Sequence, residues 1–407
     1  MNIKNNIKIE RIDDQARGIC FIDNKITFVP NTLIGEIVDI EIIKETSKYN
    51  IGKVIKYIKI SEERIEVKCP FYNECGGCNL LHTNYTNSVL YKKDKLKNIL
   101  SKFAGIDIDI EFIENKNIFN YRNKVDLKIV NSLWGYFNSN THDFVNIDNC
   151  LLVNNEINKV IENKDLFNIK SGNIVIRCNY NNEILIAINS SDEVSIDIDS
   201  LKVKVKLVGI VVNDQVYYGE KYFIESVNNK LFKVNYNSFF QINPYITNKM
   251  IETIEDNIVG ENILDLYCGV GFLGQVISNK VNKIYGIEIN QNSILDAISN
   301  ANMNRLDNTY YMCGDSSKLI DKIKDNIDTV IIDPPRTGLY KNMYDDLIRI
   351  SSDRIIYVSC DPITLARDLK ELNEYYIVDK IYGMDMFSNT YHIESIAILN
   401  KRLDEEK

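Results

Sequence analysis

The chain has 407 residues, of which 45% are hydrophobic and 26% charged, a composition typical of globular proteins long enough for two or three domains. No stretch approaches the roughly 18 consecutive apolar residues of a membrane span, and the first residues lack the apolar core of a signal peptide, so we expect a cytoplasmic protein with no membrane partner. The net charge of −9 argues against nonspecific coating of nucleic acid, although residues 1–105 hold more Lys and Arg than Asp and Glu.

The first predicted region, residues 1–60, consists of short strands that alternate apolar and polar side chains. Turn-forming pairs interrupt them at Asp13-Asp14, Asp23-Asn24 and Pro30-Asn31. This pattern predicts a small β-barrel domain. Its basic excess would suit RNA phosphates, although the same lysines would also serve simply as a solvated surface.

Residues 61–235 are predicted to form a mixed α+β central domain. A helix is expected at about 84–104, where it could pack on the catalytic domain, and strand-like runs occupy 173–178, 184–188 and 203–212. Outside these runs the secondary-structure signals are weak, so this region is the least sharply defined of the three.

A group of cysteines lies at the start of the central region. Cys69, Cys75 and Cys78 are closely spaced, and Cys150 is a plausible distant fourth member. The chain has nine cysteines, an odd number, so we do not expect a disulfide framework. Four thiolates suit either tetrahedral zinc or an iron–sulfur cluster, and spacing alone does not choose between them. The cysteines interpreted instead as small core side chains are Cys20, Cys178, Cys268 and Cys313.

Residues 236–407 alternate strands with helices and are predicted to form an α/β domain with a doubly wound parallel sheet. The expected strands are 262–267, 283–289, 309–312, 329–332 and 354–358, and the expected helices between them are 293–303 and 364–373. Ligands of such sheets bind at the carboxyl ends of the strands. Candidate functional residues are therefore sought where these strands end.

The first of these strands ends in a glycine-rich turn, Asp265-Leu266-Tyr267-Cys268-Gly269-Val270-Gly271. The glycines permit close approach of a ligand, and Glu288, at the end of the next strand, has the spacing of a carboxylate that accepts hydrogen bonds from ribose hydroxyls. A dinucleotide dehydrogenase shares this pattern, but we find no residues suited to the nicotinamide side. The arrangement favours S-adenosylmethionine as the ligand.

Two later strand ends carry further candidate residues. Asp333 begins the run Asp333-Pro334-Pro335-Arg336, which places a carboxylate at the ligand-binding edge, although such a run can also be merely a turn. Cys360 follows the next strand and precedes a helix that Pro362 can start. Because a helix N-terminus lowers the pKa of a thiol, we expect Cys360 to be a thiolate nucleophile rather than core filler.

Glu394 lies in an apolar strand near the C-terminus, in the run His392-Ile393-Glu394. A carboxylate is unusual in a buried strand. A general base is one explanation for it, and a surface-exposed strand end is the other.

Taken together, these motifs resemble the RNA uracil-5-methyltransferase family, and their order matches along most of the chain. The run from Ser238 to Asn243 is similar to the motif before its methyl-donor domain, and Ser359-Cys360-Asp361-Pro362 is similar to its nucleophile motif. The resemblance implies that Cys360 is the nucleophile and Glu394 the base. It also implies that the methyl donor is bound by Gln241, Tyr267, Glu288 and Asp333, and that Gln241 and Asp333 lie near the uracil edge as well.

The resemblance also bears on the first two regions. Ribosomal RNA members of the family hold a [4Fe–4S] cluster with this cysteine pattern, which favours iron–sulfur over zinc for Cys69, Cys75, Cys78 and Cys150. Residues 1–60 look like the TRAM domain, a small RNA-binding β-barrel. We therefore expect a monomeric enzyme that methylates C5 of a uridine in 23S ribosomal RNA, with transfer RNA as the alternative substrate.

Two other functions stay open from the sequence. A non-catalytic RNA-binding assembly factor could keep the fold, although Cys360, Glu394 and the donor residues are all present. A cytosine C5 methyltransferase would use the same covalent chemistry on a different base. Analysis of the methylated nucleoside separates these possibilities.

Overall fold

The computed structural model describes residues 2–138 and 142–402, and the chain divides into two compact units. The first unit comprises Met1–Lys95, Tyr136–Val145 and Phe387–His392, and the second comprises Leu96–Gly135, Asn146–Met386 and Ile393–Lys407. No helix among the described residues is both long and apolar enough to cross a bilayer.

The N-terminal part of the first unit is a six-stranded sheet with the order β1-β5-β6-β4-β3-β2. Its strands are β1 (Ile3–Lys8), β2 (Arg11–Ile12), β3 (Gly18–Ile22), β4 (Lys25–Val29), β5 (Ile37–Glu45) and β6 (Tyr49–Lys59). Alternating side chains, among them Cys20, Val38 and Ile40, face one small core. The carboxylate of Glu36 is fully buried and accepts hydrogen bonds from Arg64, at 2.5 and 2.7 Å. This pair fastens the start of the next segment to the sheet.

The helix expected at 84–104 consists of two pieces. α2 (Tyr85–Ile99) continues into a π-helical turn, Leu100–Ala104, which ends at Gly105 in the left-handed conformation. Leu96, Ile99 and Leu100 belong to the large hydrophobic core of the second unit. A short helix, α1 (Tyr72–Cys75), precedes α2.

The central strands form a seven-stranded sheet with the order β10-β9-β8-β12-β13-β15-β16. In chain order they are β8 (Lys124–Val130), β9 (Leu133–Phe137), β10 (Phe144–Asn146), β12 (Ser171–Cys178), β13 (Glu183–Asn189), β15 (Lys206–Val212) and β16 (Gln215–Gly219). The strand expected from residue 203 begins only at Lys206. The reason is that Asp197 caps a helix, α4 (Ile198–Lys204), by accepting a hydrogen bond from the Ser200 amide.

Smaller elements surround this sheet and lead to the next. They are α3 (Asn155–Glu162), a 3-10 turn at Lys164–Leu166, the pair β11 (Phe167–Asn168) and β14 (Ser195–Ile196), and the hairpin of β17 (Tyr222–Val227) and β18 (Lys230–Asn235).

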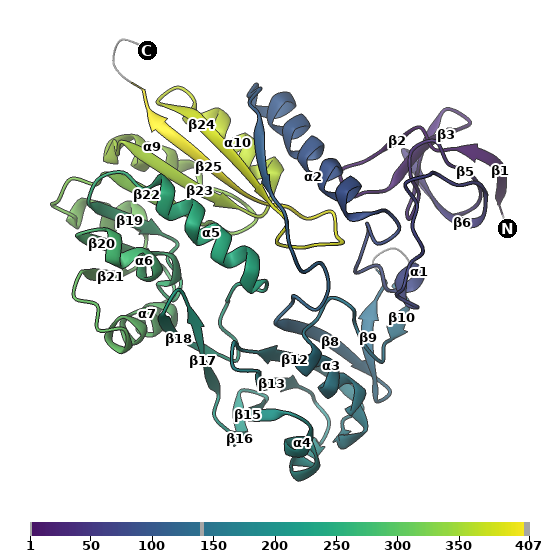
Figure 1. Cartoon of the computed structure of the whole chain (residues 1–407), viewed down its shortest axis with the longest axis horizontal. Coiled ribbons are helices and arrows are strands. Elements are labelled where there is room, and N and C mark those ends of the chain that lie inside the picture. Colours follow the sequence, from purple (N-terminus) through teal and green to yellow (C-terminus); the bar gives the residue numbers. More distant parts are fainter. Residues whose placement is uncertain (1, 139–141, 403–407) are drawn as a thin grey trace. The chain divides into compact units, whose positions relative to one another are not determined.

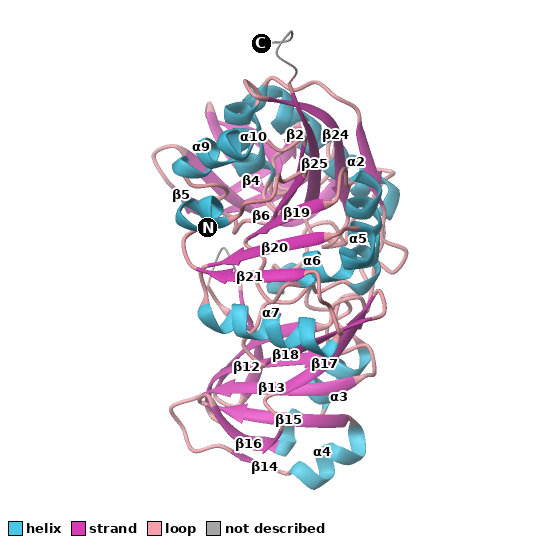
Figure 2. Cartoon of the chain, turned by 90° about the vertical axis from the view of Figure 1, so that its left-hand side faces the viewer, coloured by secondary structure: helices cyan, strands magenta, loops and turns pink. Residues whose placement is uncertain are grey.

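The C-terminal strands form an eight-stranded sheet with the order β21-β20-β19-β22-β23-β25-β24-β7. The strands are β7 (Ile110–Ile113), β19 (Asn262–Leu266), β20 (Lys283–Glu288), β21 (Thr309–Cys313), β22 (Thr329–Ile332), β23 (Arg354–Ser359), β24 (Tyr376–Met384) and β25 (Glu394–Lys401). Figure 2 shows β19, β20 and β21 side by side, and Figure 1 shows the β24–β25 hairpin in yellow.

Helices connect these strands. They are α5 (Pro244–Asn257), α6 (Phe272–Ile277), α7 (Gln291–Met303), α8 (Ser316–Leu319), α9 (Lys341–Ile350) and α10 (Pro362–Leu372), with 3-10 turns at Ser278–Lys280 and Ile320–Lys322. From β21 to β23 the sheet is parallel, as expected. β25 instead runs antiparallel to both β23 and β24, because the connection 385–393 is shorter than the dozen or so residues of a parallel crossover.

Candidate active site

The reversed strand β25 brings three candidate side chains to one edge of the sheet. Asp333 follows β22, and Cys360 follows β23, so both lie at carboxyl ends of parallel strands. β25 begins at Glu394, and its next residue, Ser395, pairs with Ser359. The Ser395 hydroxyl also donates to the Ser359 carbonyl oxygen at 3.0 Å. This register sets the start of β25 beside the end of β23, and with it Glu394 beside Cys360.

Because these groups lie close together, neighbouring charges influence the pKa values of Cys360 and Glu394. Burial and then the nearby Glu394 raise the pKa of the Cys360 thiol to about 11, against an opposing effect of Arg336. Glu394 is 5% exposed, and burial followed by Asp333 holds its pKa well above the usual value, again opposed by Arg336. Burial raises the pKa of Asp333 to about 7. At neutral pH the Cys360 thiol therefore holds its proton.

The expectation that the helix N-terminus lowers the pKa of the Cys360 thiol is wrong. Asp361 caps α10, and its Oδ1 accepts hydrogen bonds from the Ile363 amide at 2.9 Å and the Thr364 amide at 3.1 Å. These amides are therefore engaged by a carboxylate rather than directed at the thiol. Burial and two carboxyl groups outweigh the remaining positive influences.

The glycine loop, residues 267–271, joins β19 to α6. Gly271 has a φ of 76°, and a Cβ at this position would lie 2.6 Å from the Tyr311 hydroxyl, so glycine is required there. The Glu288 carboxylate accepts hydrogen bonds from the Gly269 amide at 3.2 Å and the Asn290 amide at 2.8 Å. Glu288 thus holds the glycine loop against the end of β20, and its predicted hydrogen bonds with ribose hydroxyls stay a prediction.

Two buried polar atoms beside the glycine loop have no hydrogen-bond partner among the described residues. They are the Tyr267 hydroxyl and Oδ1 of Asp265, whose other oxygen accepts from the Gly274 amide at 3.0 Å. Tyr267 also has a φ of 62°, a conformation that bulky residues rarely adopt outside functional sites. Unsatisfied polar atoms around an open glycine turn fit the binding of a polar ligand such as S-adenosylmethionine.

Gln241 lies in the segment before α5. Its backbone oxygen accepts a hydrogen bond from the Asn123 side chain at 3.0 Å. The neighbouring Phe240 packs on Phe272, the first residue of α6, with ring centroids 5.1 Å apart. The segment therefore contacts the helix that follows the glycine loop, and Gln241 is among the residues that line a cavity that none of Cys360, Asp333 and Glu394 lines.

Comparison with known proteins decides the family. Residues 84–402 match the family model described as tRNA (uracil-5-)-methyltransferase, and residues 5–55 match that of the TRAM domain. The chain belongs to the RNA uracil-5-methyltransferase family. An uncharacterized RNA methyltransferase of Clostridium tetani is 32% identical over 450 aligned residues, covering 99% of this chain and 97% of the relative. A second uncharacterized RNA methyltransferase, from Caldanaerobacter subterraneus, is 29% identical, covering 97% and 98%.

A solved structure extends the likeness to the fold. The crystal structure of Pyrococcus abyssi tRNA (uracil-54, C5)-methyltransferase in complex with S-adenosyl-L-homocysteine has a TM-score of 0.80 and 25% identity, covering 97% of this chain and 99% of that one. The expected fold class, with a TRAM domain before a methyltransferase sheet, is confirmed. Membership makes the protein an S-adenosylmethionine-dependent RNA methyltransferase of uracil C5.

The segment that leads to Glu394 in this methyltransferase, residues 387–392, is held within the first unit by hydrogen bonds to its backbone oxygens. The fully buried Lys92 donates from Nζ to the Phe387 oxygen at 3.0 Å, and Lys95 donates to the Tyr391 oxygen at 2.9 Å. The Asn389 oxygen accepts from the backbone amides of residues 79 and 80, at 3.0 and 3.1 Å. These contacts fix the chain immediately before the candidate base.

The four expected cluster ligands fall in different units. Cys69, Cys75 and Cys78 surround α1 in the first unit, and Cys69 and Cys78 both lie near Tyr72, since after burial they contribute to raising the pKa of its hydroxyl. Cys150 belongs to the second unit. Across residues 2–138 and 142–402, no three His, Cys, Asp or Glu side chains are arranged as a metal site.

The opposing effect of Arg336 on the Cys360 thiol predicts a pH effect. Because Arg336 lowers the thiol pKa, Arg336→Met raises it, and thiolate then forms only at higher pH. We expect kcat/KM to increase with pH through the neutral range, and this increase to move alkaline by roughly one pH unit in Arg336→Met, which is about tenfold in rate at pH 7. The measurement is the pH profile of methylation; Arg305→Met, at another exposed arginine, is the control. An equal loss of rate at every pH would contradict this role.

Proposed function

We propose that this enzyme methylates C5 of a uridine in 23S ribosomal RNA, with Cys360 as the nucleophile and Glu394 as the base. The observation that supports the proposal is the register of β23 and β25, which sets a thiol and a buried carboxyl side by side at the edge where the glycine loop also lies. A nucleophile and a base on one sheet edge, beside a donor-binding turn, match the requirements of this reaction.

The chemistry explains why both groups are needed. C5 of uracil becomes a strong nucleophile only after the Cys360 sulfur bonds to C6, which pushes the electron pair of the C5–C6 double bond into an enolate. C5 then attacks the electrophilic methyl group of S-adenosylmethionine, and the bond between that methyl group and the donor sulfur breaks, which leaves S-adenosyl-L-homocysteine. Glu394 then removes the C5 proton, the C6–sulfur bond breaks, and the thiolate is regenerated. To reach Cys360, the uridine must first leave the RNA stack.

The remaining residues are proposed to position the two substrates. Tyr267 and Glu288 hold the methyl donor, because the Tyr267 hydroxyl lacks a partner among the described residues and Glu288 supports the glycine loop. Asp333 faces the same edge as Cys360 and is proposed to contact the uracil and the donor, together with Gln241. Because the pKa of Asp333 is raised to about 7, its carboxyl would be protonated in part of the molecules near neutral pH.

The identity of the RNA is tested by nucleoside analysis. Support for 23S ribosomal RNA comes from the TRAM domain combined with the cysteine pattern, whereas the Pyrococcus abyssi relative acts on uracil 54 of tRNA. We expect deletion of the gene to remove 5-methyluridine from 23S RNA, as measured by mass spectrometry of separated ribosomal and transfer RNA, and the wild-type gene to restore it. Loss of 5-methyluridine from transfer RNA alone would make transfer RNA the substrate. Loss of 5-methylcytidine instead would identify cytosine as the target base, and no loss of either nucleoside would favour an assembly factor.

We also propose that Cys69, Cys75 and Cys78 bind a [4Fe–4S] cluster, with Cys150 as fourth ligand on the basis of the sequence. Its role would be structural, within a monomeric, cytoplasmic enzyme. We expect anaerobically purified protein to contain about four iron and four sulfide per chain, and Cys75→Ser to lose both, while Cys313→Ser keeps them. Zinc without sulfide would contradict the cluster.

A further inference from the structure

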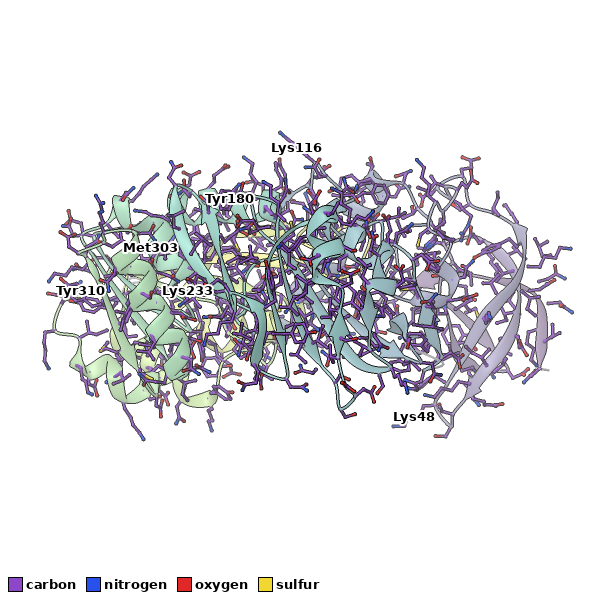
Figure 3. All side chains as sticks on the ribbon, turned by 90° about the horizontal axis from the view of Figure 1, so that it is seen from below. Lys48, Lys116, Tyr180, Lys233, Met303 and Tyr310 are labelled. Carbon is purple, nitrogen blue, oxygen red and sulfur yellow. The ribbon has the colours of Figure 1, made fainter. Side chains whose placement is uncertain are left out.

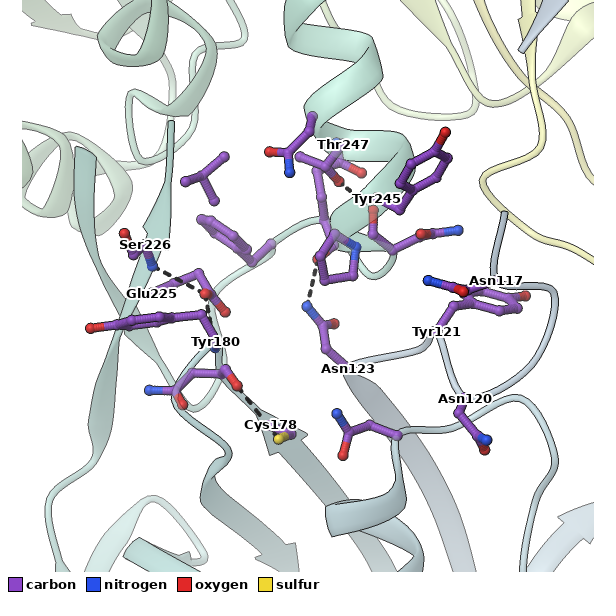
Figure 4. A pocket seen from close by; sticks show the side chains of 18 of the residues that line it. Asn117, Asn120, Tyr121, Asn123, Cys178, Tyr180, Glu225, Ser226, Tyr245 and Thr247 are labelled. Carbon is purple, nitrogen blue, oxygen red and sulfur yellow. Dashed lines mark hydrogen bonds between the residues drawn. The ribbon is translucent and has the colours of Figure 1, made fainter. Parts of the chain in front are cut away.

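A cavity of about 560 Å³ lies in the second unit (Figure 4). Its walls come from the segment 117–123 before β8, the turn 178–182 between β12 and β13, residues 225–227 of β17, and residues 240–248 leading into α5. This volume is in the range of pockets that enclose a small organic ligand, such as one nucleoside. None of Cys360, Asp333 and Glu394 is among the lining residues.

The lining combines amide side chains with aromatic rings. Asn182 and Asn248 line the cavity, and their side-chain amides hydrogen-bond to no described residue. An amide offers both a donor and an acceptor, as the edges of nucleobases do. Tyr180 lines the same cavity and is 59% exposed, so its ring is available for a base to stack on. The lining therefore suits a nucleobase better than a phosphate group.

Glu225 narrows the choice of base. It lines the cavity, is 5% exposed, and its Oε1 accepts from the Tyr180 and Ser226 amides, both at 3.0 Å. No described group donates to Oε2. A buried carboxyl with one oxygen left over disfavours phosphate and can accept a hydrogen bond from an exocyclic amino group, which adenine, cytosine and guanine carry, whereas uracil offers only its ring N3–H. The pocket therefore favours a base with an amino group over the target uracil.

Two side-chain contacts link the pocket to the helix after the glycine loop and to a surface lysine. Phe240 and Gln241 line it, and Phe240 packs on Phe272 directly after the glycine loop. Lys116 lies over the ring of Tyr245, another lining residue, at 5.6 Å, and points outward from the surface (Figure 3). A base in the pocket would thus belong to a nucleotide near the target, with a cation near its backbone.

We propose that this pocket binds a second, unstacked nucleobase of the RNA substrate, one that carries an exocyclic amino group, beside the target uridine. The proposal rests on the function proposed above. It assigns Tyr180 to stacking and Glu225 to selection of the base, and it gives the enzyme a contact that reads sequence next to the modified position.

The test measures affinity for single-stranded RNA 12-mers of adenosine, cytidine or uridine by fluorescence anisotropy. We expect the wild-type protein to bind the adenosine and cytidine strands about tenfold more tightly than the uridine strand, as expected for one stacked and hydrogen-bonded base. Glu225→Gln should remove most of this preference, and Tyr180→Ala should weaken binding of the adenosine strand most. Tyr217→Ala, at another exposed tyrosine of the same sheet, is the control and should change nothing.

The proposal would be overturned if the wild-type protein bound the three strands with equal affinity. It would also be overturned if Tyr180→Ala weakened the binding of all three strands by the same factor. Because Tyr180 is exposed, its removal should not unfold the protein, and thermal unfolding checks this. The measurement does not involve methylation. A wild-type protein that binds without base preference but still methylates uridine would reject the pocket and leave the proposed function intact.

Discussion

Glu394→Gln should trap the enzyme on its own RNA product. The amide cannot remove the C5 proton, so after methyl transfer the bond between Cys360 and C6 has no route to break. We expect turnover to fall by about 10²- to 10⁴-fold, the range for loss of a general base. Methylated RNA should remain attached to the protein, seen as a shifted band on a denaturing gel and as a mass increase that includes the methyl group.

Two controls make this result specific. Without S-adenosylmethionine the trapped species should not accumulate, because sulfur addition to C6 is reversible until C5 is methylated. Glu374→Gln replaces an exposed carboxylate of the same domain and should behave as wild type. Normal turnover in Glu394→Gln would show that another group removes the proton, and we would then withdraw the assignment of the base.

The sequence predicted those parts of the methyltransferase sheet that depend on local pattern. β19, β20, β22 and β23 lie within one residue of the expected bounds, because apolar runs followed by Gly, Asp or Pro mark buried parallel strands and their ends. The run before β15 was misjudged for the same local reason: Val203 suggested a strand, but it is 83% exposed on a helix that Asp197 caps. Helix capping outweighed the preference of one β-branched residue.

Features that depend on pairing between distant segments were predicted only in part. Glu394 was flagged as a carboxylate in an apolar strand, yet its place beside Cys360 follows from the antiparallel direction of β25. Only the length of the connection 385–393 signals that direction in the sequence. The position of Arg336 near both groups, and the pairing of Glu225 with Tyr180, have no spacing signature, because their partners come from other strands.

The pKa of the Cys360 thiol determines how much thiolate is present before the substrate binds. Because the pKa of the Cys360 thiol is raised to about 11, only a small fraction of it is ionised at neutral pH in the free enzyme. Arg336 opposes this rise in the thiol pKa, so its guanidinium, rather than the helix N-terminus, is the positive charge that favours the thiolate.

Cys360→Ala should abolish attachment to RNA that carries 5-fluorouridine. With this RNA the wild-type thiolate adds to C6 and C5 is methylated, but fluorine cannot leave as a cation, so the covalent complex persists on a denaturing gel. Without the sulfur no enolate forms, and we expect methylation of ordinary RNA to fall by at least about 10⁴-fold, as for removal of other nucleophiles. Cys313→Ala removes a half-buried thiol of the same sheet and should form the complex normally. A complex that still forms in Cys360→Ala would place the nucleophile elsewhere, whereas its loss together with unchanged RNA affinity would assign the covalent step to this thiol.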